Sequence, residues 1–152
     1  MTAEERLAQL GLTLPAAPRP LAAYVTVARV ADVLYTAGVT CMRDGQLAYS
    51  GKLGTDLTVA QGQDAARIAA LNQLSILQAE LGTLDRVVRV ARLVGYVASA
   101  PGFGQQPEVL DGASELLVAV LGEAGRHARS VAGANELPRN CPVLIDLTVH
   151  VR

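Results

Sequence analysis

Aromatic residues are scarce in this 152-residue chain: they make up 3% of it, and tryptophan is absent. Proteins that bind single-stranded nucleic acids use aromatic side chains as stacking platforms for the bases. The 13 Lys and Arg residues nearly cancel the 14 Asp and Glu residues, so the net charge of −1 creates no positive field for a phosphate backbone. The composition therefore argues against nucleic acid as a partner.

The chain has only two cysteines and no long hydrophobic run. Cys41 and Cys141 stand far apart, without a CxxC motif or neighbouring histidines, so we expect no zinc site, no disulfide framework and no metal or cofactor. No run approaches the roughly 20 apolar residues of a transmembrane helix. Glu4 and Glu5 do not fit the basic start of a secretory signal. We expect a cytoplasmic protein that does not associate with membranes.

What the chain does have is apolar residues, 51% of the total, which is enough for one domain with a proper core. Residues 2–11 predict a short helix, with Thr2 as its cap, Glu5 three residues later and Gly11 as its stop. Three prolines in "TLPAAPRP" predict an extended connector. We divide the chain into this N-terminal helix and connector, 1–19, and a main domain, 20–152.

The main domain begins with two predicted strands and a long helix. "AYVTVARV" (23–30) and "VLYTAGVT" (33–40) are rich in β-branched and aromatic residues and indicate an antiparallel hairpin. Thr58 followed by Gln61 predicts a capping box that opens a helix to about residue 81. Its apolar stripe, at helical spacing, consists of Ala70, Leu74, Leu77 and Leu81.

The second half repeats this order. Arginines 86, 89 and 92 recur at helical spacing, but the abundance of valine from 87 to 97 favours a strand after a brief helical turn. A helix follows at about 106–121, and "VLIDLTVHVR" at the end alternates as a half-buried strand does. The elements predict an α+β fold, a two-layer sandwich with two helices on one face of a single sheet. The other face of the sheet predicts a homo-oligomer.

Several strings carry a resemblance to a known family: "AAYVTVARVADVLYTAGVT", "GASELLVAVLGEAGRHARS" and "ELPRNCPVLIDL" among them. From about residue 20 to 152, the chain resembles a longer-chain branch of the YjgF/RidA superfamily. The resemblance implies a chorismate-mutase-like fold with a mixed sheet, a homotrimer, and clefts between subunits that bind small carboxylates. It also implies hydrolysis of reactive enamines and imines, such as 2-aminoacrylate, to a keto acid and ammonia. Members also carry the label of endoribonuclease, which the charge balance does not favour.

The resemblance assigns roles to four residues. Arg129, in "HARS", matches the family's arginine and would hold a substrate carboxylate through two parallel hydrogen bonds, as the catalytic and binding anchor. Tyr24 and Gly38 match positions that line the cleft, and Asp111 stands where many members have Asn. Each has a plainer interpretation: a solvated arginine, a half-buried tyrosine, a bend, and a surface acid. Arg126 and His127 fall outside the motif, and we expect ordinary surface residues there.

Two departures from the deaminase pattern leave the activity open. Ala37 and Val39 flank Gly38 where the deaminases have polar residues, and Leu144 stands at the position of a glutamate that positions the attacking water. Asp146 lies on the same strand face, but two residues along, about 6.6 Å away. Three hypotheses follow: an enamine or imine deaminase with altered or weak activity, a non-catalytic metabolite-binding or sensing protein, and an endoribonuclease.

Overall fold

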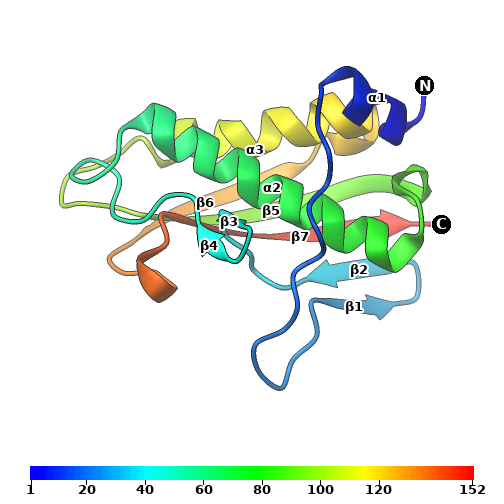
Figure 1. The fold of residues 1–152 in the computed structure, drawn as a ribbon, viewed down its shortest axis with the longest axis horizontal. Coiled ribbons are helices and arrows are strands. Elements are labelled where there is room, and N and C mark those ends of the chain that lie inside the picture. Colours follow the sequence, from blue (N-terminus) through cyan, green and yellow to red (C-terminus); the bar gives the residue numbers. More distant parts are fainter.

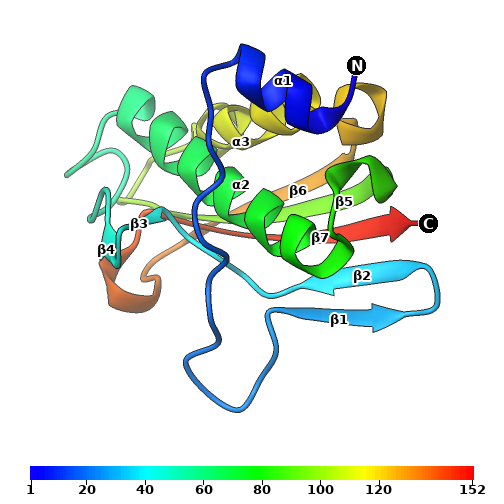
Figure 2. The same ribbon diagram turned by 45° about the vertical axis from the view of Figure 1, so that its right-hand side comes forward.

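A five-stranded sheet forms one layer of the computed structural model, which describes residues 1–152, and helices form the other layer (Figures 1 and 2). The helices and strands are α1 (Ala3–Gln9), β1 (Val27–Val30), β2 (Val33–Thr36), β3 (Met42–Arg43), β4 (Gln46–Leu47), α2 (Val59–Leu81), β5 (Val87–Ala98), α3 (Gln106–Leu121), β6 (Ala128–Ala134) and β7 (Val143–Val151). Short 3₁₀ turns precede β5 at Leu84–Arg86, β6 at Gly122–Gly125 and β7 at Pro138–Asn140. The α+β class and the two-layer arrangement are confirmed.

The order of the strands decides which residues can share a site. The large sheet runs β1-β2-β7-β5-β6, so β1 and β6 form its two opposite edges. All neighbours are antiparallel except β5 and β6, which makes the sheet mixed, as expected. The strands β3 and β4 form a separate small hairpin. Three strands, β2, β7 and β5, therefore lie between β1 and β6.

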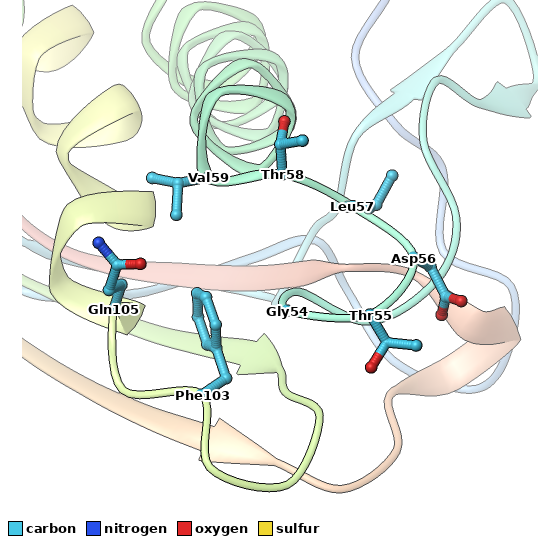
Figure 3. Close-up of a pocket in the computed structure, with 8 residues that line it drawn as sticks. All are labelled: Gly54, Thr55, Asp56, Leu57, Thr58, Val59, Phe103 and Gln105. Atoms are coloured by element: carbon cyan, nitrogen blue, oxygen red, sulfur yellow. The ribbon is translucent and has the colours of Figure 1, made fainter.

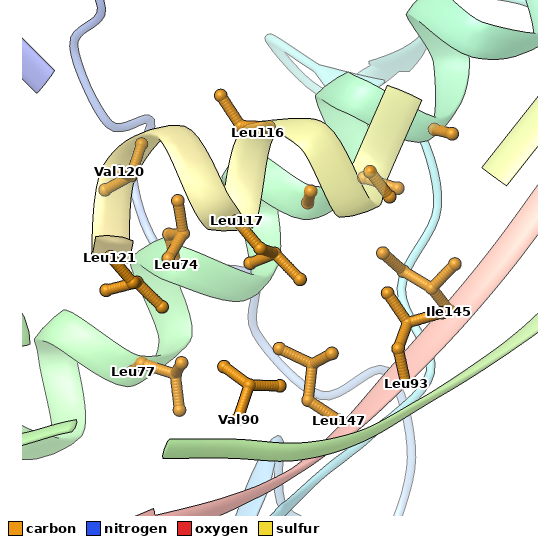
Figure 4. Packing of buried hydrophobic residues seen from close by; sticks show 14 of the residues in the cluster. Leu74, Leu77, Val90, Leu93, Leu116, Leu117, Val120, Leu121, Ile145 and Leu147 are labelled. Carbon is orange, nitrogen blue, oxygen red and sulfur yellow. The ribbon is translucent and has the colours of Figure 1, made fainter. Parts of the chain in front are cut away.

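The two long helices lie on the same face of the sheet, and the core fills the space between the layers. The Thr58 side chain accepts from the backbone N–H of Gln61, and the Gln61 side chain accepts from the N–H of Thr58, so α2 begins with the predicted capping box. Figure 4 shows apolar side chains of α2 and α3 packed over those of β5 and β7. The stripe predicted for α2 is fully part of this core: Ala70, Leu74, Leu77 and Leu81.

The first predicted strand is four residues shorter than expected. The chain from 21 to 24 forms a bend, in which the Tyr24 N–H donates to the Ala22 carbonyl, and β1 begins at Val27. The bend leaves Tyr24 outside the strand, with half of its surface exposed. The prediction that Tyr24 lies on a strand was wrong. The second strand ends at Thr36, four residues before the predicted end at residue 40, so Gly38 follows the strand.

The helix α1 packs on the rest of the fold through its polar side chains as well as its apolar ones. The Glu4 carboxylate accepts from the Leu84 N–H at 2.9 Å and from the Thr83 hydroxyl at 3.0 Å. Ala3 and Leu7 belong to the main core. The boundary at residues 19 and 20 stays a prediction.

Both ends of the described chain meet at one residue. The Ala3 N–H donates to Asp85 Oδ1 and the Arg152 guanidinium donates to the Asp85 carbonyl, each at 3.0 Å. In Figure 1 the two termini accordingly lie at the same end of the molecule. None of the helices combines the length and apolar character needed to cross a bilayer.

Candidate functional site

Arg129 is the second residue of the edge strand β6, and its side chain points toward α3. Nη1 donates to Asp111 Oδ1 at 2.9 Å and to Ser114 Oγ at 3.2 Å, and Nη2 donates to the Pro107 carbonyl at 3.3 Å. The partners lie one helical turn apart along α3, since residues separated by three or four positions share a helix face. The guanidinium is thus fixed against one helix, and its side chain is 23% exposed.

Two of the five N–H groups of Arg129 take no part in these bonds. The bonds use both N–H groups of Nη1 and one of Nη2, which leaves the Nε–H and the second Nη2–H. Such a pair of N–H groups on one guanidinium can hold a carboxylate with two parallel hydrogen bonds. The structure therefore brings Arg129 and Asp111 together and leaves two N–H groups of Arg129 without a hydrogen bond.

Asp111 changes the electrostatics of this position. Its carboxylate pairs with Arg129 and is 46% exposed, so the two charges cancel where an anion would bind. An amide at this position could accept the same hydrogen bond from Arg129 without cancelling its charge. An incoming carboxylate must therefore compete with one that is already present.

Ser114 and His127 are members of the cluster that sequence reasoning missed. The Ser114 hydroxyl lies 2.9 Å from His127 Nε2, and His127 Nδ1 lies 2.7 Å from the Gly125 carbonyl oxygen. The expectation that His127 is an ordinary surface residue was wrong, because the imidazole is half-buried against α3. The spacing carried a signal for one pair: Ser114 follows Asp111 by three positions on a helix, which places the two on one face. His127 directly precedes β6, two positions before Arg129.

Arg126 does match the plainer expectation. Its side chain is exposed and pairs with Glu123 at 3.1 Å. A surface depression of about 390 Å³ lies beside Ser114, lined also by Glu115, Val118, Ala119 and Arg126. Ser114 thus contributes to this hollow, which neither His127 nor Arg129 lines.

Tyr24 and Gly38 lie elsewhere in the single chain. Tyr24 precedes β1 and Gly38 follows β2, while Arg129 lies on β6, the opposite edge strand of the sheet. The Tyr24 hydroxyl accepts from the Leu21 N–H at 3.4 Å and contacts none of the other predicted site residues. The four predicted residues therefore form one pair, Arg129 with Asp111, and two separate positions.

The backbone around Gly38 is held by hydrogen bonds from α2, and the side chain of Leu144 lies against it. The Gln73 side chain, fully buried on α2, donates to the Ala37 carbonyl at 3.0 Å and to the Ile145 carbonyl at 2.8 Å. A Cβ added at Gly38 would lie 3.2 Å from Leu144 Cγ. Leu144 therefore occupies the side of Gly38 from which a ligand would approach the missing Cβ.

Leu144 and Asp146 share the face of β7 that points away from the helices, as predicted. Both are half-buried, and they alternate with fully buried residues of the core face. Burial raises the pKa of the Asp146 carboxyl, and the nearby Arg92 charge opposes this effect. No hydrogen bond joins Asp146 to Arg129 or Gly38 within one chain.

A further hollow, of about 360 Å³, lies where α2 begins (Figure 3). Phe103 and Gln105, from the loop before α3, face Thr58 and Val59 at the first turn of α2. None of the four predicted site residues lines it. No three His, Cys, Asp or Glu side chains are grouped so that they could hold a metal ion, and both cysteines are buried and free.

Comparison with known proteins finds one matching family and several similar proteins of nearly the same length. Residues 4–151 match the family described as "YjgF/chorismate mutase-like, putative endoribonuclease". Protein TCP17 of Trypanosoma cruzi is 42% identical over 146 residues, which cover 95% of this chain and 91% of that protein. The crystal structure of Atu1372, a protein of unknown function from Agrobacterium tumefaciens, is 43% identical, with a TM-score of 0.93 over 99% of this chain and 92% of the other. A Shewanella oneidensis protein described as a putative endoribonuclease is 36% identical, with a TM-score of 0.96 over 99% of this chain and 100% of the other.

Proposed function

This chain belongs to the YjgF/RidA family, and on that basis we propose that it binds a small carboxylate-bearing metabolite at Arg129 and hydrolyses enamines or imines there. The observation that carries the proposal is the state of Arg129: three hydrogen bonds to α3 fix its guanidinium, and two N–H groups remain for a ligand. A carboxylate held by both would be oriented as well as bound, because a planar fork allows little rotation.

Hydrolysis of an enamine or imine requires few catalytic groups besides Arg129, which binds the carboxylate. An enamine such as 2-aminoacrylate gains a proton at carbon to give the imine, water adds to the C=N carbon, and the C–N bond breaks to give a keto acid and ammonia. Free enamines undergo these steps without a catalyst, so holding the substrate beside ordered water contributes through orientation alone. Since Leu144 can neither orient water nor carry a proton, we expect turnover to be slow.

A homotrimer is part of the proposal, with cytoplasm as its place of action. Arg129 and Gly38 lie in opposite halves of the sheet, so a ligand can contact both only if a second copy supplies one of them. The sheet face opposite the helices also exposes apolar side chains, including Val30, Tyr35 and Tyr96. Contact between copies over this face would remove that surface from water.

The test is release of keto acid from 2-aminoacrylate and from bulkier imines generated in situ. We expect the wild type to release pyruvate faster than the buffer does, and Arg129→Ala to lose this increment. Arg126→Ala, in which an exposed arginine three residues away is removed, serves as the matched control. Equal rates for the wild type and Arg129→Ala would refute the proposed activity.

One observation favours a second candidate function, that of a non-catalytic metabolite binder. Leu144 lies against Gly38, where the deaminases of the family have a glutamate nearby, and Ala37 and Val39 add no polar group. This function predicts saturable binding of keto acids without turnover. Leu144→Glu separates the two: if the wild type is silent and the variant gains imine hydrolysis, the pocket is intact and the wild-type protein is a binder.

A further inference from the structure

We propose that binding of a carboxylate at Arg129 is coupled to uptake of a proton by His127, with Ser114 as the link between them. The inference rests on the anion site of the proposed function and adds its regulation by pH. It is carried by two features of the cluster: the direction of the hydrogen bonds and the balance of charge.

The direction of the hydrogen bonds follows from the chemistry of each group. The Gly125 carbonyl only accepts, so His127 Nδ1, 2.7 Å away, carries a hydrogen. In the neutral imidazole, Nε2 is then an acceptor, and the Ser114 hydroxyl donates to it over 2.9 Å. Arg129 Nη1 donates to a lone pair of the same Ser114 oxygen. With neutral His127, the only hydrogen of the Ser114 hydroxyl is therefore engaged.

Protonation of His127 reverses the direction of its hydrogen bond with Ser114. Both ring nitrogens then carry a hydrogen, so Nε2 donates to Ser114 Oγ. The two lone pairs of that oxygen receive hydrogens from His127 and Arg129, and the hydroxyl hydrogen is released. It can donate to an anion held by Arg129, because Ser114 Oγ is bonded to the same guanidinium. The site gains a donor without any movement of the backbone.

The charge balance also favours carboxylate binding when His127 is protonated. Arg129 and Asp111 together carry no net charge, so a bound carboxylate would leave the cluster with one excess negative charge. Protonated His127 supplies the positive charge that Asp111 cancels, and the ligand then brings the cluster to neutrality. Histidine is the side chain whose charge ordinarily changes between about pH 5 and pH 8. Binding and protonation therefore favour each other, because such coupling is reciprocal.

The other charges around His127 largely offset one another. Glu123 pairs with Arg126 at 3.1 Å and lies 4.0 Å from Arg89. Arg92 donates to Ser130 Oγ, on the opposite face of the edge strand. The charged groups on the elements that pack around His127 are Glu108, Asp111 and Glu115 of α3, Glu123 of the turn after it, Arg126 and Arg129 beside His127, and Arg89 and Arg92 of β5. Asp111 is the one that contacts the Arg129 anchor directly.

The experiment is calorimetric titration of the protein with pyruvate, a small keto acid, at pH 6, 7 and 8 in buffers of different ionisation enthalpy. For the wild type we expect a fall in affinity of roughly tenfold from pH 6 to pH 8, which corresponds to an average uptake of about half a proton per bound pyruvate over this range. His127→Gln should bind weakly with no dependence on pH. His150→Gln is the matched control, because the only other histidine pairs with Asp32 in the opposite half of the sheet, and it should behave as the wild type does.

Asp111→Asn gives a second readout should His127→Gln fold poorly. Removal of the cancelling charge should raise the affinity at pH 8 toward that of the wild type at pH 6 and lower the proton uptake. Pyruvate binding by the wild type that is independent of pH, or proton uptake that survives in His127→Gln, would overturn the coupling. Proton-linked binding without imine hydrolysis would overturn the proposed activity alone, and no pyruvate binding at any pH would overturn both.

Discussion

At the scale of single residues, the candidate site depends on how one guanidinium is shared. Arg129 contacts Asp111, Ser114 and the Pro107 carbonyl while keeping two N–H groups for a ligand. A lysine has three donors on one nitrogen and cannot reach all of these acceptors with the geometry of a planar fork. The type of cation, and not only its charge, should therefore matter.

Arg129→Lys tests this requirement. We expect carboxylate affinity to fall about tenfold or more, because a single ammonium cannot hold both α3 and the ligand in parallel hydrogen bonds. Arg126→Lys, the same change at an exposed position, should leave affinity unchanged. The measurement is pyruvate titration of both variants, and equal affinities for the two would show that Arg129 acts as a point charge.

Asp146 should make the stability of the fold depend on pH in a defined direction. Burial raises the pKa of its carboxyl, with Arg92 in opposition, so the folded protein holds this proton more tightly than the unfolded chain does. The ionised group therefore costs stability above its raised pKa, and the cost disappears as the pH falls through that value toward the ordinary one.

Asp146→Asn should consequently be more stable than the wild type at pH 7, by about 1 kcal/mol or less for a partly solvated group. The advantage should vanish below about pH 4, near the ordinary pKa of aspartate, where both side chains are neutral. Thermal unfolding at pH 4, 5.5 and 7 provides the measurement. A variant that is less stable than the wild type at pH 7 would mean that ionised Asp146 has a favourable partner in the protein.

At the scale of helices and strands, the two long helices meet through a glycine. A Cβ at Gly112 of α3 would lie 2.1 Å from the carbonyl oxygen of Gln63 on α2. A flexible side chain could rotate away from the added methyl group, but a backbone carbonyl cannot. The two helices must therefore move apart to make room for it. The spacing of the helix layer, and with it the position of Asp111 next to Gly112, depends on this contact.

Gly112→Ala should therefore lower the free energy of unfolding by about 1–3 kcal/mol, despite the better helix propensity of alanine. Gly104→Ala is the matched control, since no atom lies within 4 Å of the Cβ it would add. Urea denaturation of both variants should show a lower midpoint for Gly112→Ala alone. Equal midpoints would mean that the helices separate without loss of packing.

Elements with strong local signals were predictable from the sequence, and elements fixed by single contacts were not. The capping box at Thr58 and the valine-rich run of β5 gave the helix and strand where the structure has them. The bend at Tyr24 depends on one local hydrogen bond among residues that favour a strand, so composition could not reveal it. Ser114 lies on α3 and His127 lies after the turn at Gly122–Gly125, and their contact depends on how this turn returns the chain along the helix, which composition does not reveal.

At the scale of the whole molecule, the strand order separates the two halves of the proposed site. Gly38 follows β2 and Arg129 lies on β6, at the far edge of the sheet. If the cleft forms between copies, a defect in one half can be supplied by a neighbour. An assembly made of two differently inactive chains would then contain some intact sites.

Mixing Arg129→Ala with Gly38→Leu chains, followed by unfolding and reassembly together, tests this arrangement. In randomly assembled equal mixtures, about a quarter of the clefts should combine an intact Arg129 with an intact Gly38. We expect pyruvate-binding sites, absent from each variant alone, to reappear at about that fraction. Light scattering checks that the mixture has the mass of the wild-type assembly, and a mixture without binding would place both residues' roles within one chain.

The meeting of Ala3 and Arg152 at Asp85 has a consequence for the connectivity of the fold. Because these two residues contact the same aspartate, a short linker could join them and leave every strand in place, and the polypeptide would become a closed ring. New termini could then be opened in the exposed turn at Asp44 and Gly45, between the two strands of the small hairpin. Such a circular permutant would keep the sheet order and the Arg129 cluster while reversing which half of the chain leaves the ribosome first.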